Sequence, residues 1–252
     1  MTIARTGLRA VFLAAGFGTR MYPLTRDKAK PLLQVGGEPL LTRLVRQVGE
    51  CGEVTDGVVV VNGRFHDDFV EWREGLGTGL PLTLVNDRVT DDRAPLGAIA
   101  DLALALREAT PREVGGHVVV AGDNLFDFDL RPFLRRFLDR GRGQLLLRRI
   151  PRPVPPRRYN EVALDEGGGV VSFREKPDEP GTELAAIAVY FLPAELPSLI
   201  DEYLATGAKR DAPGYLMEWL HRRIPLEGSF FDGAWFDIGN MESFAQARVA
   251  FG

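Results

Sequence analysis

The stretch from Arg9 to Gly37 reads RAVFLAAGFGTRMYPLTRDKAKPLLQVGG, and the rest of the chain can be interpreted around it. It opens with an apolar run that has the length of a strand and ends at a glycine. In the turn that follows, Gly16 and Gly18 allow backbone N–H groups to approach a ligand closely. Arg20 and Lys30 place two cations behind this turn. The stretch therefore predicts a binding site for a polyphosphate.

Two familiar phosphate-binding loops do not fit this stretch. A P-loop would need Gly-Lys-Ser/Thr at a set spacing, and Met21 stands where the dinucleotide fingerprint has its third glycine. The distinguishing feature is the longer string LAAGFGTRMYPLT, followed by Lys30-Pro31-Leu32-Leu33 and then Gly36-Gly37. This string closely resembles the N-terminal signature of the sugar-1-phosphate nucleotidyltransferases, also called nucleotide-sugar pyrophosphorylases, and most of all the glucose-1-phosphate thymidylyltransferase type.

The composition is that of an ordinary globular protein. The 252 residues are 45% hydrophobic and 26% charged, and the formal net charge of −4 gives no electrostatic reason to bind nucleic acid. One cysteine and three histidines, without an HExxH motif, argue against a disulfide or a zinc site. No apolar run has the length of a signal segment or a membrane span. We therefore expect a cytoplasmic protein that binds neither nucleic acid nor a membrane.

Apolar runs and helical periodicity alternate along the first half of the chain. We expect strands at residues 10–15, 57–61, 82–85 and 117–121, and helices at 39–50, 65–74 and 97–107. Continuous apolar runs are typical of strands buried on both faces of a parallel sheet. The alternation predicts a doubly wound, Rossmann-like α/β sheet. Ligands bind such sheets at the carboxyl ends of the strands, where the Gly16 turn and Asp123 fall.

The second half has a different pattern. We expect a basic helix at 131–140, strands at 144–150, 161–164, 170–174 and 184–191 and near Phe230, and helices at 193–205, 214–223 and 241–249. No helix separates the last three numbered strands, which predicts a small antiparallel extension. The loop at 151–158 is rich in proline and arginine and is typical of extended chain. Arg157 and Arg158 could touch a phosphate, although surface solubility is the simpler interpretation.

No stretch has the composition of a flexible linker, so we expect one nucleotidyltransferase domain over residues 1–252. Within it, residues 1–125 would form a nucleotide-binding lobe and residues 126–252 a sugar-phosphate-binding lobe. With the resemblance, the expected fold class is α/β. It is a doubly wound mixed sheet, Rossmann-like and glycosyltransferase-A-like, with a small antiparallel sugar-binding extension.

Four further segments match the family pattern in its order. They are Leu96-Gly97-Ala98, which the family places against the nucleotide base, Gly122-Asp123-Asn124, Glu175-Lys176-Pro177 and Trp235-Phe236-Asp237-Ile238-Gly239. Asp123 and Asp237 are far apart in sequence, and in the family the matching residues converge on one metal ion. Mg²⁺ prefers oxygen ligands, and metal-assisted phosphoryl chemistry requires such a pair.

The resemblance implies that a sugar-1-phosphate attacks the α-phosphorus of a nucleoside triphosphate, with Mg²⁺ as cofactor, and that pyrophosphate leaves. The expected catalytic residues are Arg20, Lys30, Asp123 and Lys176, and the expected metal ligands are Asp123 and Asp237. Nucleotide contacts are expected from Ala14, Ala15, Gly16, Gly18, Thr19, Arg20, Asn86, Leu96 and Gly97. Contacts to the sugar phosphate are expected from Asn160, Glu175, Lys176 and Ile187. The nucleophile is already anionic, so positioning and cationic stabilisation should supply most of the catalysis.

Two departures from the family pattern fall in the expected sugar pocket. The family's glucose-type enzymes usually have a Tyr-Gly pair where this chain has Tyr159-Asn160, and often Thr-Gly where it has Ile187-Ala188. These changes leave the nucleotidyl transfer intact and the identity of the sugar open. The segment from Asp211 to Tyr215 could also line the acceptor pocket, or simply begin a helix.

The main hypothesis is transfer of a thymidylyl or uridylyl group to a hexose-1-phosphate such as glucose-1-phosphate. An alternative is guanylyl or cytidylyl transfer to mannose-1-phosphate or another phosphorylated acceptor. A non-catalytic nucleotide-sugar-binding regulatory protein is disfavoured because all five expected charged residues are present. Asp127-Phe128-Asp129 has the Asp-x-Asp form of a glycosyltransferase metal motif but lies beyond Asp123, so we interpret it as the start of a helix. Relatives are often oligomers, so a homo-oligomer is also considered.

Overall fold

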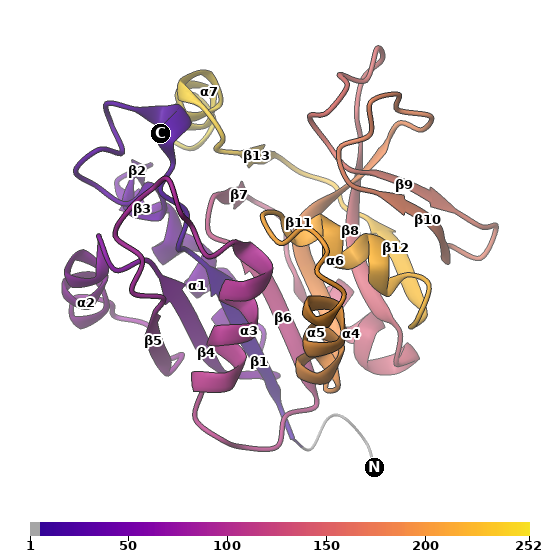
Figure 1. The fold of residues 1–252 in the computed structure, drawn as a ribbon, viewed down its shortest axis with the longest axis horizontal. Helices are drawn as coiled ribbons and strands as arrows, with labels where there is room; N and C mark the ends of the chain where they lie inside the picture. Colours follow the sequence, from indigo (N-terminus) through magenta and orange to yellow (C-terminus); the bar gives the residue numbers. More distant parts are fainter. Residues whose placement is uncertain (1–5) are drawn as a thin grey trace.

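In the computed structural model, which describes residues 6–252, a seven-stranded sheet forms the centre of the molecule (Figure 1). Its strand order is β12-β8-β11-β6-β1-β4-β5. The pairs β1–β4, β1–β6, β4–β5 and β8–β12 are parallel, whereas β11 is antiparallel to both of its neighbours. The bounds are β1 (Leu8–Leu13), β4 (Val54–Val61), β5 (Leu82–Asn86), β6 (Gly116–Ala121), β8 (Gly143–Arg149), β11 (Leu184–Pro193) and β12 (Leu226–Phe230).

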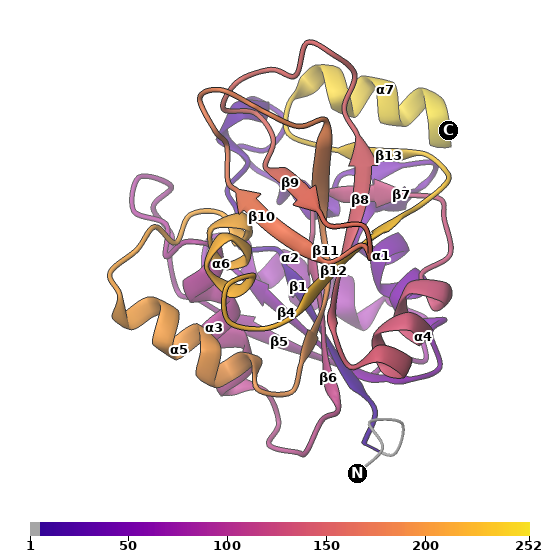
Figure 2. The ribbon, with the colours of Figure 1, turned by 90° about the vertical axis from the view of Figure 1, so that its right-hand side faces the viewer.

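Helices cover both faces of this sheet (Figure 2). One face packs against α1 (Leu40–Gly49), α2 (His66–Glu74) and α4 (Arg131–Arg140). The other face packs against α3 (Ala98–Glu108), α5 (Leu196–Ala205) and α6 (Pro213–Leu220). The last helix, α7 (Met241–Phe251), lies apart from these layers and contributes to a third, smaller apolar cluster.

The central strands are apolar on both faces because both faces are covered. Val58, Val59, Val60 and Val61 in β4 are all essentially inaccessible to solvent, and their alternate side chains enter the two different clusters. Burying an aliphatic side chain of this size contributes about 1.5–3 kcal/mol. The predicted doubly wound α/β sheet is confirmed.

The predicted antiparallel extension is smaller than expected. Only β9 (Glu161–Leu164) and β10 (Val170–Arg174) form it, as a two-stranded ribbon. The prediction that the strand at 184–191 belongs to this extension was wrong, because β11 lies in the central sheet between β6 and β8. Its sequence LAAIAVYFLP is apolar at consecutive positions, which suits a strand covered on both faces. The central sheet therefore takes strands from both expected lobes.

Two short ladders complete the fold. β7 (Asn124–Phe126) and β13 (Trp235–Asp237) pair antiparallel, and β2 (Gln34–Val35) and β3 (Glu38–Pro39) form a second small pair. Segments of two or three residues carry no periodicity, so the sequence did not predict them. The β7–β13 ladder matters most, because it brings a segment near the carboxyl end of the chain next to the end of β6.

Some element boundaries in the structure also differ from the predicted ones. β1 begins two residues earlier than expected and ends at Leu13, so Ala14 and Ala15 belong to the following loop. Residues 151–158 form neither helix nor strand, as expected. Within residues 6–252, no helix combines the length and apolar character needed to cross a membrane.

Candidate active site

The turn after β1 is held by hydrogen bonds from three directions. Gly18 has a φ of 65°, in the left-handed region that favours glycine. Its carbonyl oxygen accepts from the Thr25 hydroxyl at 2.8 Å and from the Met21 N–H at 2.8 Å. The Asn62 amide, at the end of β4, donates to the Ala15 carbonyl at 2.9 Å. The loop therefore has a defined shape, while Gly16 stays exposed.

Arg20 leaves this loop from a short 3₁₀ turn, Thr19–Met21, in which Thr19 and Arg20 are exposed. Its guanidinium reaches the far end of the chain, because a Cβ atom built at Gly239 would lie 3.7 Å from Arg20 Nη2. The same built atom would lie 3.7 Å from Asp237 Oδ1. Arg20 and Asp237 thus face the same space, although they lie 217 positions apart in the chain.

Lys30 and Asp123 meet at the carboxyl ends of the central strands. Lys30 begins a second 3₁₀ turn, Lys30–Leu32, and Asp123 follows β6. The Lys30 Nζ atom lies 2.6 Å from Asp123 Oδ2, and both side chains are at most partly exposed. Both segments lie where the rule for parallel α/β sheets places a ligand.

Asp123 and Asp237 are brought together by the β7–β13 ladder. Asp237 is the register partner of Asn124, and the Ile238 N–H donates to the Asp123 carbonyl at 3.0 Å. The Asp237 side chain opens into a cleft but is crowded by protein. This desolvation, together with the Asp123 carboxylate, raises the pKa of Asp237 to about 6, while the nearby cations Lys30, Arg20 and Arg158 act in the opposite direction.

The chemistry of this carboxylate pair fits magnesium. Mg²⁺ is commonly held by one or two protein carboxylates and keeps its remaining positions for water and substrate phosphates. No group of three or more His, Cys, Asp or Glu side chains that could cage a metal occurs among residues 6–252. Two adjacent carboxylates next to cations for phosphate are therefore the donor set that a shared metal–phosphate site would use.

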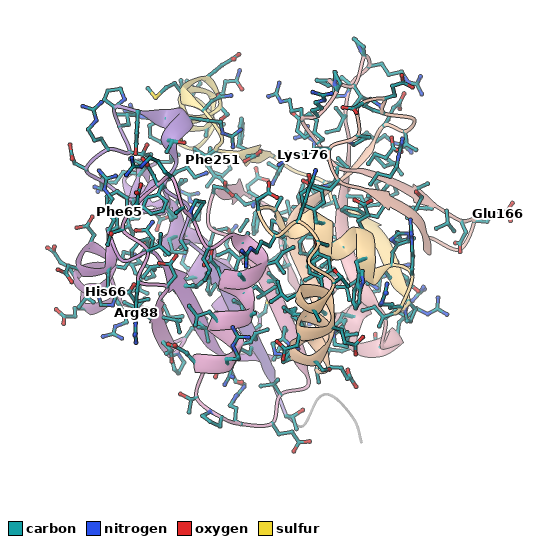
Figure 3. All side chains as sticks on the ribbon, viewed as in Figure 1. Phe65, His66, Arg88, Glu166, Lys176 and Phe251 are labelled. Carbon is teal, nitrogen blue, oxygen red and sulfur yellow. The ribbon has the colours of Figure 1, made fainter. Side chains whose placement is uncertain are left out.

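Lys176 approaches from the opposite side of the cleft. Figure 3 shows it between α7 on one side and the β9–β10 ribbon on the other. Its φ of 49° lies in the left-handed region, which is costly for a residue with a side chain. Such backbone strain occurs preferentially at functional sites. The Lys176 ammonium lies 3.6 Å from Glu175 Oε1.

The Glu175 side chain is buried next to α6. Burial raises the pKa of its carboxyl group, and Lys176 partly offsets this. The Glu175 N–H donates to Glu218 Oε2 at 3.0 Å. A Cβ atom at Gly214 would overlap the Glu175 carboxylate, so a side chain at that position would force this carboxylate to move. The segment from Asp211 to Tyr215 leads into α6 and approaches Glu175 at Gly214, while a role in the acceptor pocket stays a prediction.

Other expected contact residues have structural partners of their own. The Asn160 amide donates to the Ala186 carbonyl at 2.9 Å and accepts from the Ala186 N–H at 2.7 Å. Ile187 is buried in the core. Asn86 ends β5 and accepts from the Arg88 N–H at 2.7 Å. Leu96 and Gly97 immediately precede α3 and are half-buried. Their roles in binding stay predictions.

The sequence predicted the walls of the cleft only in part, since it offered Arg157 and Arg158 as phosphate contacts while favouring surface solubility, and it did not single out Arg148. A cavity of about 760 Å³ contains Arg20, Lys176 and Asp237, and three more arginines line it: Arg148, Arg157 and Arg158. Arg148 sits near the end of a strand that the sequence predicted, but the sequence alone does not show toward which face of the sheet its side chain points. Asp129 lies two residues before the start of α4, and its carboxylate accepts from the Arg131 N–H at 2.9 Å, in line with its interpretation as part of a helix start.

Comparisons with known proteins agree with this geometry. A UTP–glucose-1-phosphate uridylyltransferase of Haloferax volcanii is 30% identical over 74% of this chain and 73% of its own length. A mannose-1-phosphate guanylyltransferase of Mycobacterium tuberculosis is 30% identical over 95% of this chain and 63% of its own. A crystal structure assigned as a glucose-1-phosphate thymidylyltransferase from Bacillus anthracis, with bound sucrose, has a TM-score of 0.81 at 25% identity and covers 97% of this chain and 95% of its own.

The chain spans 58% of one of its first curated relatives and 73% of another. The family model of the nucleotidyl transferases matches residues 9–251, which is nearly all of the sequence. The resemblance seen in the opening stretch is thereby confirmed, and the chain belongs to the nucleotidyl transferase family.

Proposed function

We propose that this protein transfers a nucleotidyl group from a nucleoside triphosphate to a sugar-1-phosphate, giving a nucleotide sugar and pyrophosphate. The observation that carries the proposal is the pairing of Asp237 with the segment after Asp123, with Arg20 and Lys30 on one side and Lys176 on the other. We propose UTP or dTTP with a hexose-1-phosphate such as glucose-1-phosphate as the substrates.

The chemistry assigned to each residue follows from its charge and position. A phosphate oxygen of the sugar-1-phosphate forms a new bond to the α-phosphorus, and the bond from that phosphorus to the pyrophosphate oxygen breaks. Lys176 orients the acceptor phosphate, and Arg20 and Lys30 hold the triphosphate. Asp123 and Asp237 would hold Mg²⁺, which when bound would screen repulsion between the anionic reactants. Two anions are thus brought into line by cations that are fixed in advance.

Relatives with comparable similarity carry the names of different nucleotidyl groups, so the nucleotide base has to be measured. The test is pyrophosphate release with Mg²⁺, in which UTP, dTTP, GTP, CTP and ATP are crossed with glucose-1-phosphate, mannose-1-phosphate and other sugar-1-phosphates. Release that requires one triphosphate and one acceptor together would support the proposal and identify both. Binding of a nucleotide sugar without release from any pair would favour a regulatory protein instead.

A further inference from the structure

The cleft that holds the reactive groups has an unusual balance of charge. Five cationic side chains line it, Arg20, Arg148, Arg157, Arg158 and Lys176, against Asp237 as the one acidic residue in its lining. Like charges gathered in one space repel each other, and an anionic ligand would relieve that repulsion. Arg20 and Lys176 have a place in the proposed function, whereas the other three arginines have none.

Arg148 is the most firmly held of these three. It sits at the end of β8, and its guanidinium carbon lies 5.2 Å from the centre of the Trp235 ring. Its Nη1 atom also donates to the Trp235 carbonyl at 3.3 Å. Trp235 lies in β13, two residues before Asp237. Arg148 is therefore tied to the same strand that carries the carboxylate.

Arg158 lines the same cleft as Asp237 from the loop before β9. Its guanidinium carbon lies 5.2 Å from the centre of the Tyr159 ring. Among the described residues, neither Arg148 nor Arg158 forms an ion pair with an acidic side chain. Arg157 differs, because it pairs with Asp178. With Arg20 assigned to the triphosphate, Arg148 and Arg158 are thus the two cations of the cleft that have neither an ion-pair partner among the described residues nor a role in the proposed function.

We propose that Arg148 and Arg158 bind the terminal phosphates of the nucleotide and the pyrophosphate that leaves. This inference rests on the proposed function. The cleft is shared with Arg20, which belongs to the triphosphate loop, so a phosphate chain held by that loop can extend to the opposite wall. The acceptor phosphate already has Lys176. Each arginine offers several N–H donors in a planar fork that matches phosphate oxygens.

The consequence for the reaction is specific. As the bond to the α-phosphorus breaks, negative charge grows on the departing pyrophosphate. Cations held in place before the reaction stabilise that growing charge without reorganising. Arg148 and Arg158 are therefore expected to affect triphosphate use and pyrophosphate use together, and to leave the affinity for the sugar phosphate unchanged.

The test combines a binding measurement with kinetics. Isothermal titration calorimetry would measure the affinity of the full chain for pyrophosphate in the presence of Mg²⁺. Variants Arg148→Gln, Arg158→Ala and the double variant would be compared with wild type. Arg149→Ala and Arg152→Ala are matched controls, because Arg149 lies over Phe230 and Arg152 pairs with Glu183, both outside this cleft. Thermal melting would verify that each variant folds, and Arg148→Lys would replace the glutamine variant if that one did not.

We expect each single variant to weaken pyrophosphate binding about tenfold, and the double variant more, with the controls unchanged. In the reverse reaction the KM for pyrophosphate should rise, while in the forward reaction the KM for the sugar phosphate stays the same. Unchanged pyrophosphate affinity in the double variant would overturn the inference, and so would a rise confined to the KM of the sugar phosphate. Arginine-dependent pyrophosphate binding without turnover would keep the inference and reject the proposed function.

Discussion

The two walls of the cleft are built in different ways. On the nucleotide side, the turn after β1 is fixed by Asn62 and Thr25, and Lys30 is paired with Asp123. On the opposite wall, Arg158 and Lys176 are exposed and lie in the loops before β9 and after β10, and of the two Lys176 is assigned to the acceptor.

This difference shows which part of the reaction the fold defines in advance. Groups fixed by hydrogen bonds and burial keep one geometry with or without a ligand, which suits the triphosphate that every reaction of this type shares. An exposed cation in a loop, such as Lys176, adapts more readily, which suits an acceptor that can differ from one relative to the next.

The largest effect is expected at the carboxylates where the two walls meet. Asp123→Asn and Asp237→Asn should each lower turnover about a thousandfold or more, because a metal ligand is lost, and about 1.4 kcal/mol corresponds to each factor of ten. Asp237→Asn should keep or gain thermal stability, since repulsion with Asp123 is relieved, whereas Asp123→Asn also loses the ion pair with Lys30 and should be less stable than Asp237→Asn. Steady-state kinetics and thermal unfolding measure the two effects. Near-normal turnover in either variant would reject the metal assignment.

Lys176 tests the acceptor side through both its charge and its backbone. Lys176→Ala and Lys176→Gly should both raise the KM for the sugar phosphate about tenfold to a hundredfold, since the cation is lost in each. The glycine variant should be more stable than the alanine variant by about 1 kcal/mol, because only glycine adopts a φ of 49° without strain. Urea unfolding compares the two. An effect confined to triphosphate binding would show that Lys176 belongs to the nucleotide side of the cleft, and its assignment to the acceptor would be wrong.

Gly214 gives a smaller test of the same side. Gly214→Ala would force the Glu175 carboxylate to move, because the added Cβ overlaps it. We expect a loss of about tenfold in kcat/KM for the sugar phosphate with the KM for the triphosphate unchanged, as an altered acceptor pocket would give. Gly79→Ala, where no atom lies within 4 Å of the added Cβ, is the control. An equal loss for both substrates would mean that α6 supports the whole cleft.

The sequence predicted the nucleotide side better than the acceptor side, and the reason is physical. The residues around Gly16 and Asp123 work through local backbone conformation at strand ends, so a contiguous motif describes them. Arg148 reaches the cleft only because β8 turns that side chain, and not its neighbour Arg149, toward Trp235. A shift of one residue in register would exchange the two.

Contacts between segments that are distant in the chain could also not be predicted from the sequence. The pairing of Asp237 with Asn124 depends on a ladder of three residues in each strand. The resemblance implied that Asp123 and Asp237 converge, but it did not show that this ladder brings them together. The bidentate contact of Asn160 with Ala186 depends on β11 lying in the central sheet, which periodicity alone did not reveal. Local patterns predict elements, whereas the partners of a side chain depend on which elements pack together.

The smallest effect concerns stability rather than catalysis, at the first turn of α3. Asp101 is buried, and its Oδ1 atom has no hydrogen-bond partner. Burial, with a smaller contribution from Asp87, raises the pKa of Asp101 from 3.8 to about 7. Between these values the folded protein binds more protons than the unfolded chain, so this group makes the protein less stable as the pH rises through that window.

Asp101→Asn should remove this dependence on pH. From pH 5 to pH 8 the stability of the variant relative to wild type should rise by about 2 kcal/mol, because Asp101 is already ionised in the unfolded chain over this range, whereas the folded protein keeps the proton until its pKa of about 7. Urea unfolding at the two pH values measures this change, with the exposed Asp139→Asn as control. A gain of the same size at both pH values would show that the carboxylate is ionised and compensated in the folded protein. The nucleotide side would then contain a buried charge with a partner, and the contrast between the two walls would be weaker than the geometry indicates.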